Sequence, residues 1–492
     1  MTSPRRSLWI LLCLCVFLSL APEARSAEME QARDISAASL ITEQEGFSNV
    51  SGLFDGNTVS TQVYNDHSRL TLVSAEGIGS LYLIFDVEYS GYSVTDNDIG
   101  ETVWFGQNGF LHEFLDLEAA FGAAPSSVTV SFDSGAVRLN ELYVFTSGQT
   151  PEFVQRWEAP AEGQADLVLF SAHGDDDQLF FAGLLPYYAG ELGYQVQVVY
   201  LTNHRNLTTE RCHEMLDGLW AVGVRSYPVF GPFGDYYSLS LEDAYSMFRN
   251  AGVSREELDG FVVEQLRRFR PLVAVGHDVE GEYGHGQHRL YADLLRKAVS
   301  VSFDPEQYPE SAERYGVWDV PKTYLHLYLY PENPVVMDWD RPLERFGGMT
   351  AYQVTKNLGF PCHKSQYQDF AWYFTGAETA AEVSQYSPCR YGLYRSTVGQ
   401  DREKNDLFEN LTAYSALEEE PAVPTEKTFA ALSKETGAAT VPWETLQQPD
   451  KKSQSTWHSV FSLLLLPFWR QPQLRGGGAQ KIKENRKKDL LF

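Results

Sequence analysis

Residues 173–177 place an imidazole and three carboxylates within five positions, in the run His173-Gly-Asp175-Asp176-Asp177. The run directly follows the apolar stretch Ala165–Ser171, which is typical of a buried strand. Three neighbouring carboxylates repel one another and are costly to bury unless a cation lies among them. The run therefore predicts either a metal site or, as is usual for acidic loops, a solvated surface loop.

A second run of imidazole and carboxylate groups extends from His277 to His288, directly after the strand-like stretch Leu272–Gly276. If His288 opens a helix, His285 and His288 present to one side of its first turn. Two histidines and a carboxylate with one open position form a catalytic metal set, and zinc is the usual ion for hydrolysis. The alternative is a structural His-x-x-His pair, and His277 either lines the site or is a satisfied core histidine.

Strands and helices alternate from about residue 164, which would position both runs. The strand-like stretches are Ala165–Ser171, Tyr194–Leu201 and Leu272–Gly276, and the helical ones are Leu179–Ala189, Thr209–Val222 and Arg255–Phe269. Ser254 and Glu257 form a capping box for the last helix. This alternation predicts an α/β domain with a parallel sheet and a ligand site at the carboxyl ends of its strands.

Four elements in this region resemble, in the same order, motifs of the PIG-L deacetylase family, also called LmbE-like. They are Ala172–Asp177, Arg211-Cys-His-Glu214 after Leu201-Thr202, Tyr283-Gly-His285-Gly-Gln-His288, and His363-Lys-Ser365-Gln366. Members of this family are zinc-dependent enzymes that remove acetyl groups from N-acetylglucosamine conjugates. The resemblance covers about residues 164–395 and implies a Rossmann-like catalytic domain.

Carried over to this chain, the resemblance implies specific roles for the matching residues. The implied zinc ligands are His173, Asp176 and His288. Asp175 would accept a proton from the attacking water, and Arg211 would contact the sugar or a phosphate. His285 and Tyr283 would support the oxyanion, with His285 protonating the leaving amine.

Two residues depart from the family pattern, Gly174 in place of Pro and Asp177 in place of Glu. Neither change removes a ligand or the base, so the expected reaction is hydrolysis of an N-acetyl group on an N-acetylglucosamine conjugate. The alternatives are a non-catalytic exported carbohydrate-binding protein and a metal hydrolase acting on a different amide or an ester.

The sequence pattern of residues 30–155 predicts an all-β domain. Stretches rich in β-branched and aromatic residues, separated by Gly, Asp, Asn and Ser, predict a sandwich; they are Leu81–Asp86, Thr102–Phe105, Ser127–Phe132 and Leu142–Thr146. Leu53–Thr58 and Val137–Phe145 resemble the discoidin-type or galactose-binding jelly-roll modules of exported carbohydrate enzymes. The domain is then either a glycan-binding module or a spacer, because the fold alone specifies no function.

The chain contains 66 Asp and Glu against 39 Lys and Arg, a net charge of −27. This balance argues against nucleic acid as the main partner, since phosphate binding needs clustered Lys and Arg. Residues 1–27 combine a basic start, a short apolar run and a small-residue exit, which predicts a cleaved signal peptide and export. The alternative is an uncleaved anchor.

The C-terminal part of the sequence has a different composition. Residues 400–456 are acidic and predict a linker. Residues 457–492 contain an apolar run of ten residues and a basic tail, which form either a membrane-surface anchor or a packed or disordered terminus. After signal cleavage three cysteines remain, of which Cys362 and Cys389 either pair or stay buried as thiols.

Overall fold

The computed structural model describes residues 30–47, 50–64, 67–203, 209–328 and 334–416. The predicted signal peptide, residues 1–27, and the apolar and basic segment, residues 457–492, lie outside these ranges. Among the residues that are described, no helix has the length and apolar character needed to cross a membrane.

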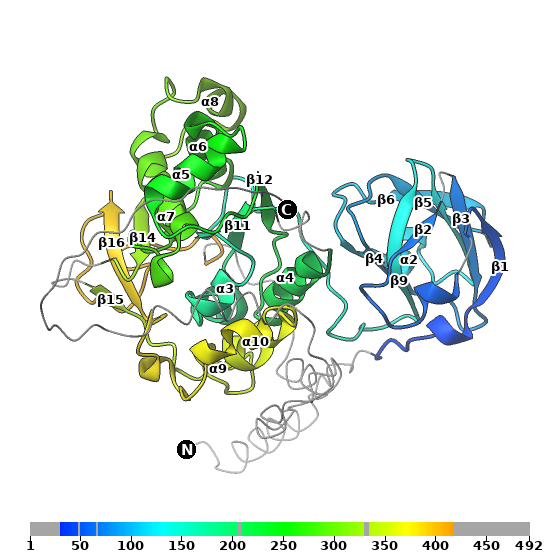
Figure 1. The fold of residues 1–492 in the computed structure, drawn as a ribbon. Helices are drawn as coiled ribbons and strands as arrows, with labels where there is room; N and C mark the ends of the chain where they lie inside the picture. Colours follow the sequence, from blue (N-terminus) through cyan, green and yellow to red (C-terminus); the bar gives the residue numbers. More distant parts are fainter. Residues whose placement is uncertain (1–29, 48–49, 65–66, 204–208, 329–333, 417–492) are drawn as a thin grey trace, which may run out of the picture. The chain divides into compact units, whose positions relative to one another are not determined.

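Two antiparallel sheets form the N-terminal region, one with strand order β1-β3-β8-β5-β6 and the other with β2-β9-β4-β7 (Figure 1). Their strands are β1 Leu40–Glu45, β2 Gln62–Tyr64, β3 Ser68–Val73, β4 Ser80–Phe85, β5 Tyr92–Asp96, β6 Glu101–Phe105, β7 His112–Asp116, β8 Ser127–Phe132 and β9 Val137–Phe145, with the short helix α2 Leu117–Phe121. Alternate residues of β4, Leu81 and Leu83, pack in one core with Leu72 of β3 and Val130 of β8. Because side chains alternate across a strand, this core lies between the two sheets. The N-terminal region is therefore sheet-rich, as predicted.

A seven-stranded sheet with order β12-β11-β10-β13-β14-β16-β15 forms the second region. Its strands are β10 Leu167–Ser171, β11 Val196–Thr202, β12 Val229–Phe233, β13 Val273–Gly276, β14 Lys322–His326, β15 Pro334–Val336 and β16 Arg390–Ser396. The first five strands in this order are parallel, whereas β16 pairs antiparallel with both β14 and β15. β10 lies between β11 and β13, so the chain turns from one side of β10 to the other, the position where α/β sheets open a crevice.

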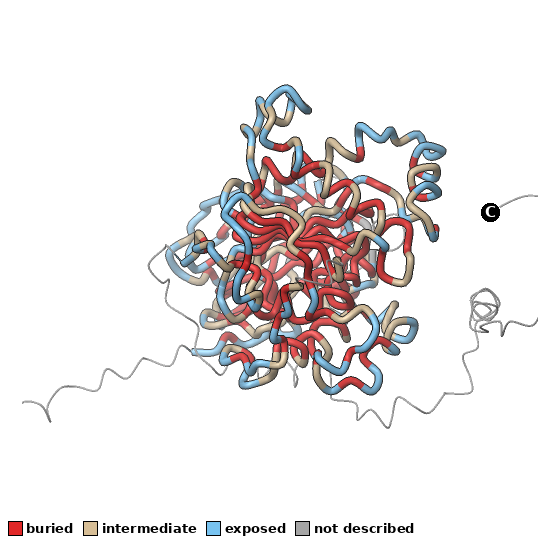
Figure 2. Tube along the Cα trace, turned by 90° about the vertical axis from the view of Figure 1, so that its left-hand side faces the viewer, coloured by how far each residue is buried: buried red, intermediate tan, exposed pale blue. Residues whose placement is uncertain are grey.

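Helices cover both faces of this sheet (Figure 1). They are α3 Asp176–Leu179, α4 Thr209–Ala221, α5 Leu241–Asn250, α6 Arg255–Phe269, α7 Gly286–Val301, α8 Pro309–Tyr315, α9 Ala351–Val354 and α10 Tyr367–Phe370. Leu167 and Leu169 of β10 share one core with α4, while Val168 and Phe170 share another with α5, α6 and α7. Figure 2 shows buried residues gathered at the centre of the tube, with exposed residues at the periphery. Burial on both faces explains why β10 is continuously apolar.

Helix α6 has the bounds predicted for it, Arg255–Phe269, and the capping box of Ser254 and Glu257 is present. In contrast, the single helix predicted over Leu179–Ala189 is wrong. Helix α3 ends at Leu179, and a π-helical turn spans Pro186–Glu191. Between them Gly183 has a φ of +92° and lies against the Trp339 side chain, which interrupts the helix.

The segment predicted as a linker from residue 400 is in part packed against the α/β region. Asp401 forms a buried ion pair with Lys322 at 2.5 Å and accepts a hydrogen bond from the Tyr324 hydroxyl. Leu407 is fully buried in the core. A linker can therefore begin only after residue 416, where the described residues end. Cys212, Cys362 and Cys389 are free thiols, so the alternative of a Cys362–Cys389 disulfide is not realised.

Candidate metal centre

Two loops that follow adjacent strands supply the site. Residues 172–177 follow β10, and residues 277–288 follow β13 and lead into α7. Because β10 and β13 pair in parallel, both loops leave the same edge of the sheet. Helix α7 begins at Gly286 with His285 as its N-cap, which puts His288 in the first turn. The topology thus brings together the two runs that the sequence singled out.

Three donor atoms from these loops form a small triangle. His173 Nδ1 lies 3.0 Å from Asp176 Oδ2 and 3.2 Å from His288 Nε2. The third edge, between His288 Nε2 and Asp176 Oδ2, is 3.2 Å. All three residues are buried, so water does not separate the donor atoms from one another.

The hydrogen-bond partners of the outer ring nitrogens show what fills this triangle. His173 Nε2 lies 2.7 Å from the Gln287 side-chain oxygen, and His288 Nδ1 lies 2.8 Å from a Glu282 oxygen. Both outer nitrogens face acceptors and therefore carry the hydrogen. The inner nitrogens then point lone pairs at each other and at the Asp176 carboxylate, an arrangement that requires a cation.

The pKa values of His288 and Asp176 also indicate that positive charge is stabilised in the triangle. Burial lowers the pKa of His288, but Asp176 and Glu282 raise it to about 9, so a proton can take the place of the cation at neutral pH. Burial raises the pKa of Asp176, yet His288 and His173 hold it well below its usual range. The site is therefore built around a negative oxygen that attracts positive charge.

The triangle fits a tetrahedral metal ion. Bonds of about 2.0–2.1 Å to nitrogen and oxygen put neighbouring ligand atoms roughly 3.3 Å apart, close to the three edges described above. Two other sets also lie within ligating distance: His285 joins His173 and His288 in one, and His277 joins Asp176 and His288 in the other. The first set lacks the Asp176 carboxylate. However, His277 Nε2 accepts a hydrogen bond from the Ala172 amide and Nδ1 contacts Glu282. Both nitrogens of His277 are occupied, so the set His173, Asp176 and His288 fits the metal better.

Asp175 lies next to Asp176 of the triangle, at the start of helix α3. It occupies the N-cap position of α3 but makes no capping hydrogen bond, and it is 5% exposed. Its closest described cation is Arg211, at 3.6 Å. Burial raises the pKa of Asp175. The Arg211 charge lowers this pKa in part, and the Asp176 charge raises it further. A buried carboxylate with a raised pKa next to a metal position is suited to accept a proton.

The two departures from the family pattern have local explanations. Gly174 packs directly against the Met215 side chain of α4, so a larger residue at this position would require the Met215 side chain to move. Asp177 faces away from the triangle, accepting hydrogen bonds from Tyr200 at 3.2 Å and Gln178 at 2.7 Å. Burial raises the pKa of Asp177 to about 8, so this side chain supports the loop and is poorly suited to hold a metal.

Arg211 is buried next to Asp175. Its guanidinium lies 3.6 Å from Asp175 and 3.6 Å from Glu214. Glu214 in turn accepts hydrogen bonds from the amide and hydroxyl of Ser365, both at 2.6 Å. The second and fourth sequence motifs thus meet here, and Nη1, the guanidinium nitrogen of Arg211 that faces Glu214, makes no hydrogen bond within the protein.

Tyr283 and His285 flank the triangle on the α7 side. The Tyr283 ring centroid lies 5.4 Å from those of His285 and His288. Tyr283 has a φ of +46°, a conformation that is strained for a residue with a side chain. His285 Nδ1 accepts the Gln287 amide at 3.3 Å, which leaves the hydrogen on Nε2. Burial, with the charges of His173 and His288, lowers the pKa of His285 to about 2.

The aromatic residues of the loop 231–240 separate into core and surface. Phe233 is buried, and the partly buried Tyr236 packs with Phe248 in the same core. Tyr237 is 62% exposed, and its ring centroid lies 5.3 Å from that of His285. Of these three, only Tyr237 offers a free ring face next to the site.

Three further side chains complete the site without having been predicted from sequence. Gln287 and Asp235 contact the outer nitrogen of His173, at 2.7 and 3.4 Å. Glu282 contacts the outer nitrogen of His288. Glu282 and Gln287 lie inside the second run, so their position next to histidines was an available signal. Asp235 has no such signal, because it reaches the site only through the fold.

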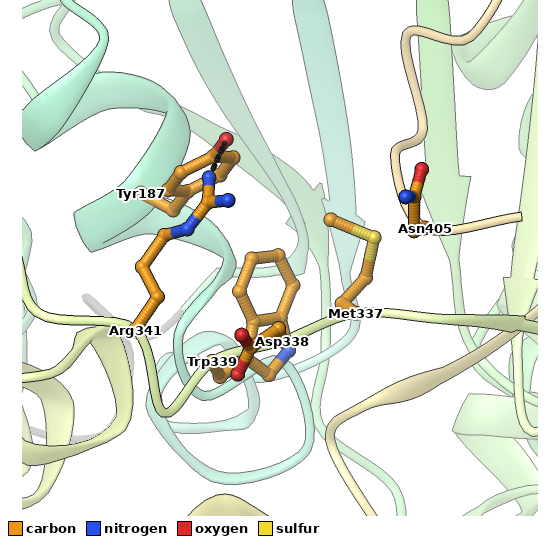
Figure 3. A pocket seen from close by; sticks show the side chains of 6 residues that line it. All are labelled: Tyr187, Met337, Asp338, Trp339, Arg341 and Asn405. Carbon is orange, nitrogen blue, oxygen red and sulfur yellow. Dashed lines mark hydrogen bonds between the residues drawn. The ribbon is translucent and has the colours of Figure 1, made fainter. Parts of the chain in front are cut away.

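A separate hollow lies near the edge strand β15 and is lined by Tyr187, Met337, Asp338, Trp339, Arg341 and Asn405 (Figure 3). Arg341 donates a hydrogen bond to the Tyr187 hydroxyl at 2.6 Å. The Trp339 indole donates to the Pro388 carbonyl. None of the six lining side chains is an imidazole or thiol, so the hollow lacks the donor set of the metal centre.

Comparison with known proteins places this geometry in a family context. Residues 168–299 match the family model described as PIG-L, GlcNAc-PI de-N-acetylase. A 1D-myo-inositol 2-acetamido-2-deoxy-alpha-D-glucopyranoside deacetylase from Streptomyces avermitilis is 24% identical over 50% of this chain and 97% of its own length. A deacetylase of the same description from Catenulispora acidiphila is 27% identical, and the match covers 39% of this chain and 65% of that protein.

Among solved structures, the N,N'-diacetylchitobiose deacetylase of Pyrococcus horikoshii is 15% identical. That match covers 48% of this chain and 86% of the other, with a TM-score of 0.33. The family match includes both loops of the metal centre, since it begins within β10 and ends within α7. Residues 168–299 of this chain are a PIG-L family domain.

Proposed function

We propose that the protein is a zinc-dependent hydrolase that removes the N-acetyl group from an N-acetylglucosamine-type conjugate, releasing acetate and a free amine. The observation that carries the proposal is the buried triangle of donor atoms from His173, Asp176 and His288. Beside it lies Asp175, whose side chain makes no capping hydrogen bond. The descriptions of the matching family and relatives support an amino-sugar substrate.

Zinc is the ion we propose, because two imidazoles and one carboxylate are its ligands in catalytic sites that keep a position open. When bound, zinc polarises a carbonyl oxygen and lowers the pKa of a water molecule. His173, Asp176 and His288 would hold it. Asp175 would then accept the proton of the water that attacks the amide, for which its raised pKa prepares it.

His285 and Tyr283 are proposed to donate hydrogen bonds to the oxyanion. The hydrogen on His285 Nε2 and the Tyr283 hydroxyl, whose pKa burial raises well above the usual value, both remain available at neutral pH. The pKa of about 2 makes His285 neutral, so it is a poor acid for the leaving amine. We therefore assign amine protonation to Asp175, after it has taken the proton of the water, in place of His285.

The wider organisation of the chain follows as part of this proposal. The crossover at β10 supports a Rossmann-like domain over about residues 164–395, and two facing antiparallel sheets support a jelly-roll sandwich over residues 30–155. Export, glycan binding by the sandwich and membrane-surface contact by residues 457–492 rest on sequence patterns alone. Arg211 is proposed to contact the sugar or a phosphate of the substrate, because its guanidinium lies 3.6 Å from the Asp175 carboxylate.

The test is a substrate panel with zinc-loaded protein. N-acetylglucosamine, its inositol conjugate, its phosphatidylinositol conjugate and diacetylchitobiose are incubated separately, and acetate and free amine are quantified. We expect equal amounts of both products from at least one conjugate. Binding without acetate release would instead favour a non-catalytic carbohydrate-binding protein. A product mass differing by a group other than acetyl would favour hydrolysis of another amide or an ester.

A further inference from the structure

Glu282 is a fully buried carboxylate that contacts three imidazoles. One of its oxygens, Oε2, lies 2.8 Å from His277 Nδ1 and 2.8 Å from His288 Nδ1. The other, Oε1, lies 2.6 Å from His326 Nδ1. All four residues have no exposed surface. A buried carboxylate is energetically costly unless hydrogen-bond donors satisfy its oxygens, as these imidazoles can.

The hydrogens in this cluster can be placed from the partners of each ring. His277 Nε2 accepts the Ala172 amide at 2.9 Å, so its hydrogen is on Nδ1 and points to Glu282. His326 Nε2 lies 2.9 Å from the Ser387 carbonyl, which can only accept. Both nitrogens of His326 therefore face oxygen atoms, and the ring is held between Glu282 and the Ser387 carbonyl. Glu282 and His326 thus form a buried hydrogen-bonded pair.

This pair connects to the metal centre by two routes. Directly, Glu282 fixes the hydrogen of His288 on Nδ1 and so aims the lone pair of Nε2 at the triangle. Indirectly, it fixes the ring of His277, which holds the backbone amide of Ala172, the residue before His173. One carboxylate thus orients two of the three donors. Carboxylates that accept the outer hydrogen of a ligating histidine commonly set ring orientation and ligand basicity.

We propose that Glu282, held in place by His326, is a positioning residue that sets the metal affinity of this centre. The inference rests on the metal site of the proposed function, but its test measures metal binding directly and needs no substrate. If the unmodified protein bound no zinc, the proposed function would fail. If it bound zinc and the variants bound it equally well, only the present inference would fail.

The first comparison is between Glu282→Gln and Glu280→Gln in the full chain. In Glu282→Gln the amide NH₂ faces at least one of the three imidazole hydrogens, so at least one ring must turn. Glu280 is a matched control two residues away, with 73% of its side chain exposed and an ion pair to Arg289 at 3.5 Å. Zinc affinity is measured by competition with a chelator, and ligand geometry by the visible absorption of the cobalt-substituted protein.

We expect Glu282→Gln to weaken zinc binding about 10–100-fold and to alter the cobalt spectrum, with Glu280→Gln unchanged in both. Circular dichroism and thermal unfolding of the metal-free proteins establish that each variant is folded. Equal zinc affinity in Glu282→Gln and the unmodified protein would overturn the inference.

A second pair of variants separates positioning from general packing. The amide nitrogen of Asn at 326 can take the place of His326 Nδ1 and still donate to Glu282, while that of Gln takes the place of Nε2 and donates to the Ser387 carbonyl. We expect His326→Gln to lose more zinc affinity than His326→Asn. If both lost thermal stability equally but kept zinc affinity, His326 would be structural only and the inference would be refuted.

Discussion

Substitution of Asp175 by Asn provides the sharpest test of the proposed chemistry. Asn has nearly the same size, and its side-chain oxygen can still approach Arg211, which lies 3.6 Å from the Asp175 carboxylate. Asp175 makes no capping hydrogen bond, so α3 loses no support. The substitution thus removes a proton acceptor and little else.

The expected loss follows from that role. A positioned proton acceptor contributes about 10²–10⁴-fold to a rate. Because the fold buries Asp175 and raises its pKa, we expect kcat to fall about 10³-fold, equivalent to about 4 kcal/mol of transition-state stabilisation. Zinc content should stay near one ion per chain, because the three ligand residues are unchanged.

The assay follows acetate release by zinc-loaded protein at saturating conjugate, with metal content measured on the same samples. Asp177→Asn is the matched control in the same loop. Asp177 faces Tyr200 and Gln178, and its pKa of about 8 means that it is mostly protonated at neutral pH. Asn resembles this protonated side chain, so we expect less than about a tenfold effect. A kcat for Asp175→Asn above a tenth of the unmodified value, with zinc bound, would refute the assignment of the base.

Three further predictions concern metal binding, substrate contact and pH-dependent stability. His173→Ala or His288→Ala should reduce the zinc content of the folded protein from about one ion per chain to near zero. Because zinc displaces a proton from His288, whose pKa is about 9, the zinc affinity of the unmodified protein should fall as the pH is lowered below 9, which calorimetry can measure. Tyr237→Ala should raise KM about 3–10-fold with kcat nearly unchanged, as expected for a lost ring contact of about 0.5–1.5 kcal/mol, whereas Tyr237→Phe should behave as the unmodified protein. Burial raises the pKa of Glu113 from 4.5 to about 7, so stability should fall by at most about 3 kcal/mol as pH rises from 4.5 to 7. Glu113→Gln, which can still accept the Phe110 amide, should show a smaller fall in denaturant unfolding between pH 5 and 8, and the part that remains belongs to other buried carboxyl groups such as Glu141, whose pKa burial also raises to about 7.

The parts of the fold that the sequence predicted are those with strong local signals. β10 and β13 are continuous apolar runs that end at polar loops, and buried parallel strands have this composition. Helix α6 was placed to the residue because its capping box defines its start. Its end follows from Arg270, which adopts a left-handed conformation with a φ of +47°.

The parts that were missed depend on distant contacts. β7, His112–Asp116, has a mixed composition and becomes a strand only by pairing with β4. The interruption after α3 requires Trp339, which is far away in sequence, to occupy the space next to Gly183. Packing of residues 401–416 depends in the same way on Lys322. No local composition encodes such contacts.

The metal centre shows the same division between local and distant signals. His173, Asp176 and His288 lie in short runs that a single sequence can reveal. The contact between Glu282 and His326 joins residues 44 positions apart, and it forms because β13 and β14 are neighbours in a parallel sheet. A sequence therefore indicates which side chains can bind a metal more readily than it indicates which groups hold them in place.

The charges in this centre favour a divalent ion. Asp176 is one corner of the buried triangle, Asp175 lies next to it in the same loop, and Glu282 contacts His288. Asp235 adds a carboxylate 3.4 Å from His173, while Arg211 is a buried cation 3.6 Å from Asp175. Negative charge is costly to bury without a counter-charge. A divalent ion at the triangle supplies that positive charge, and protons on His173 and His288 can supply it in the absence of the ion. Metal binding should therefore release protons from these histidines, and for this reason zinc affinity should depend on pH.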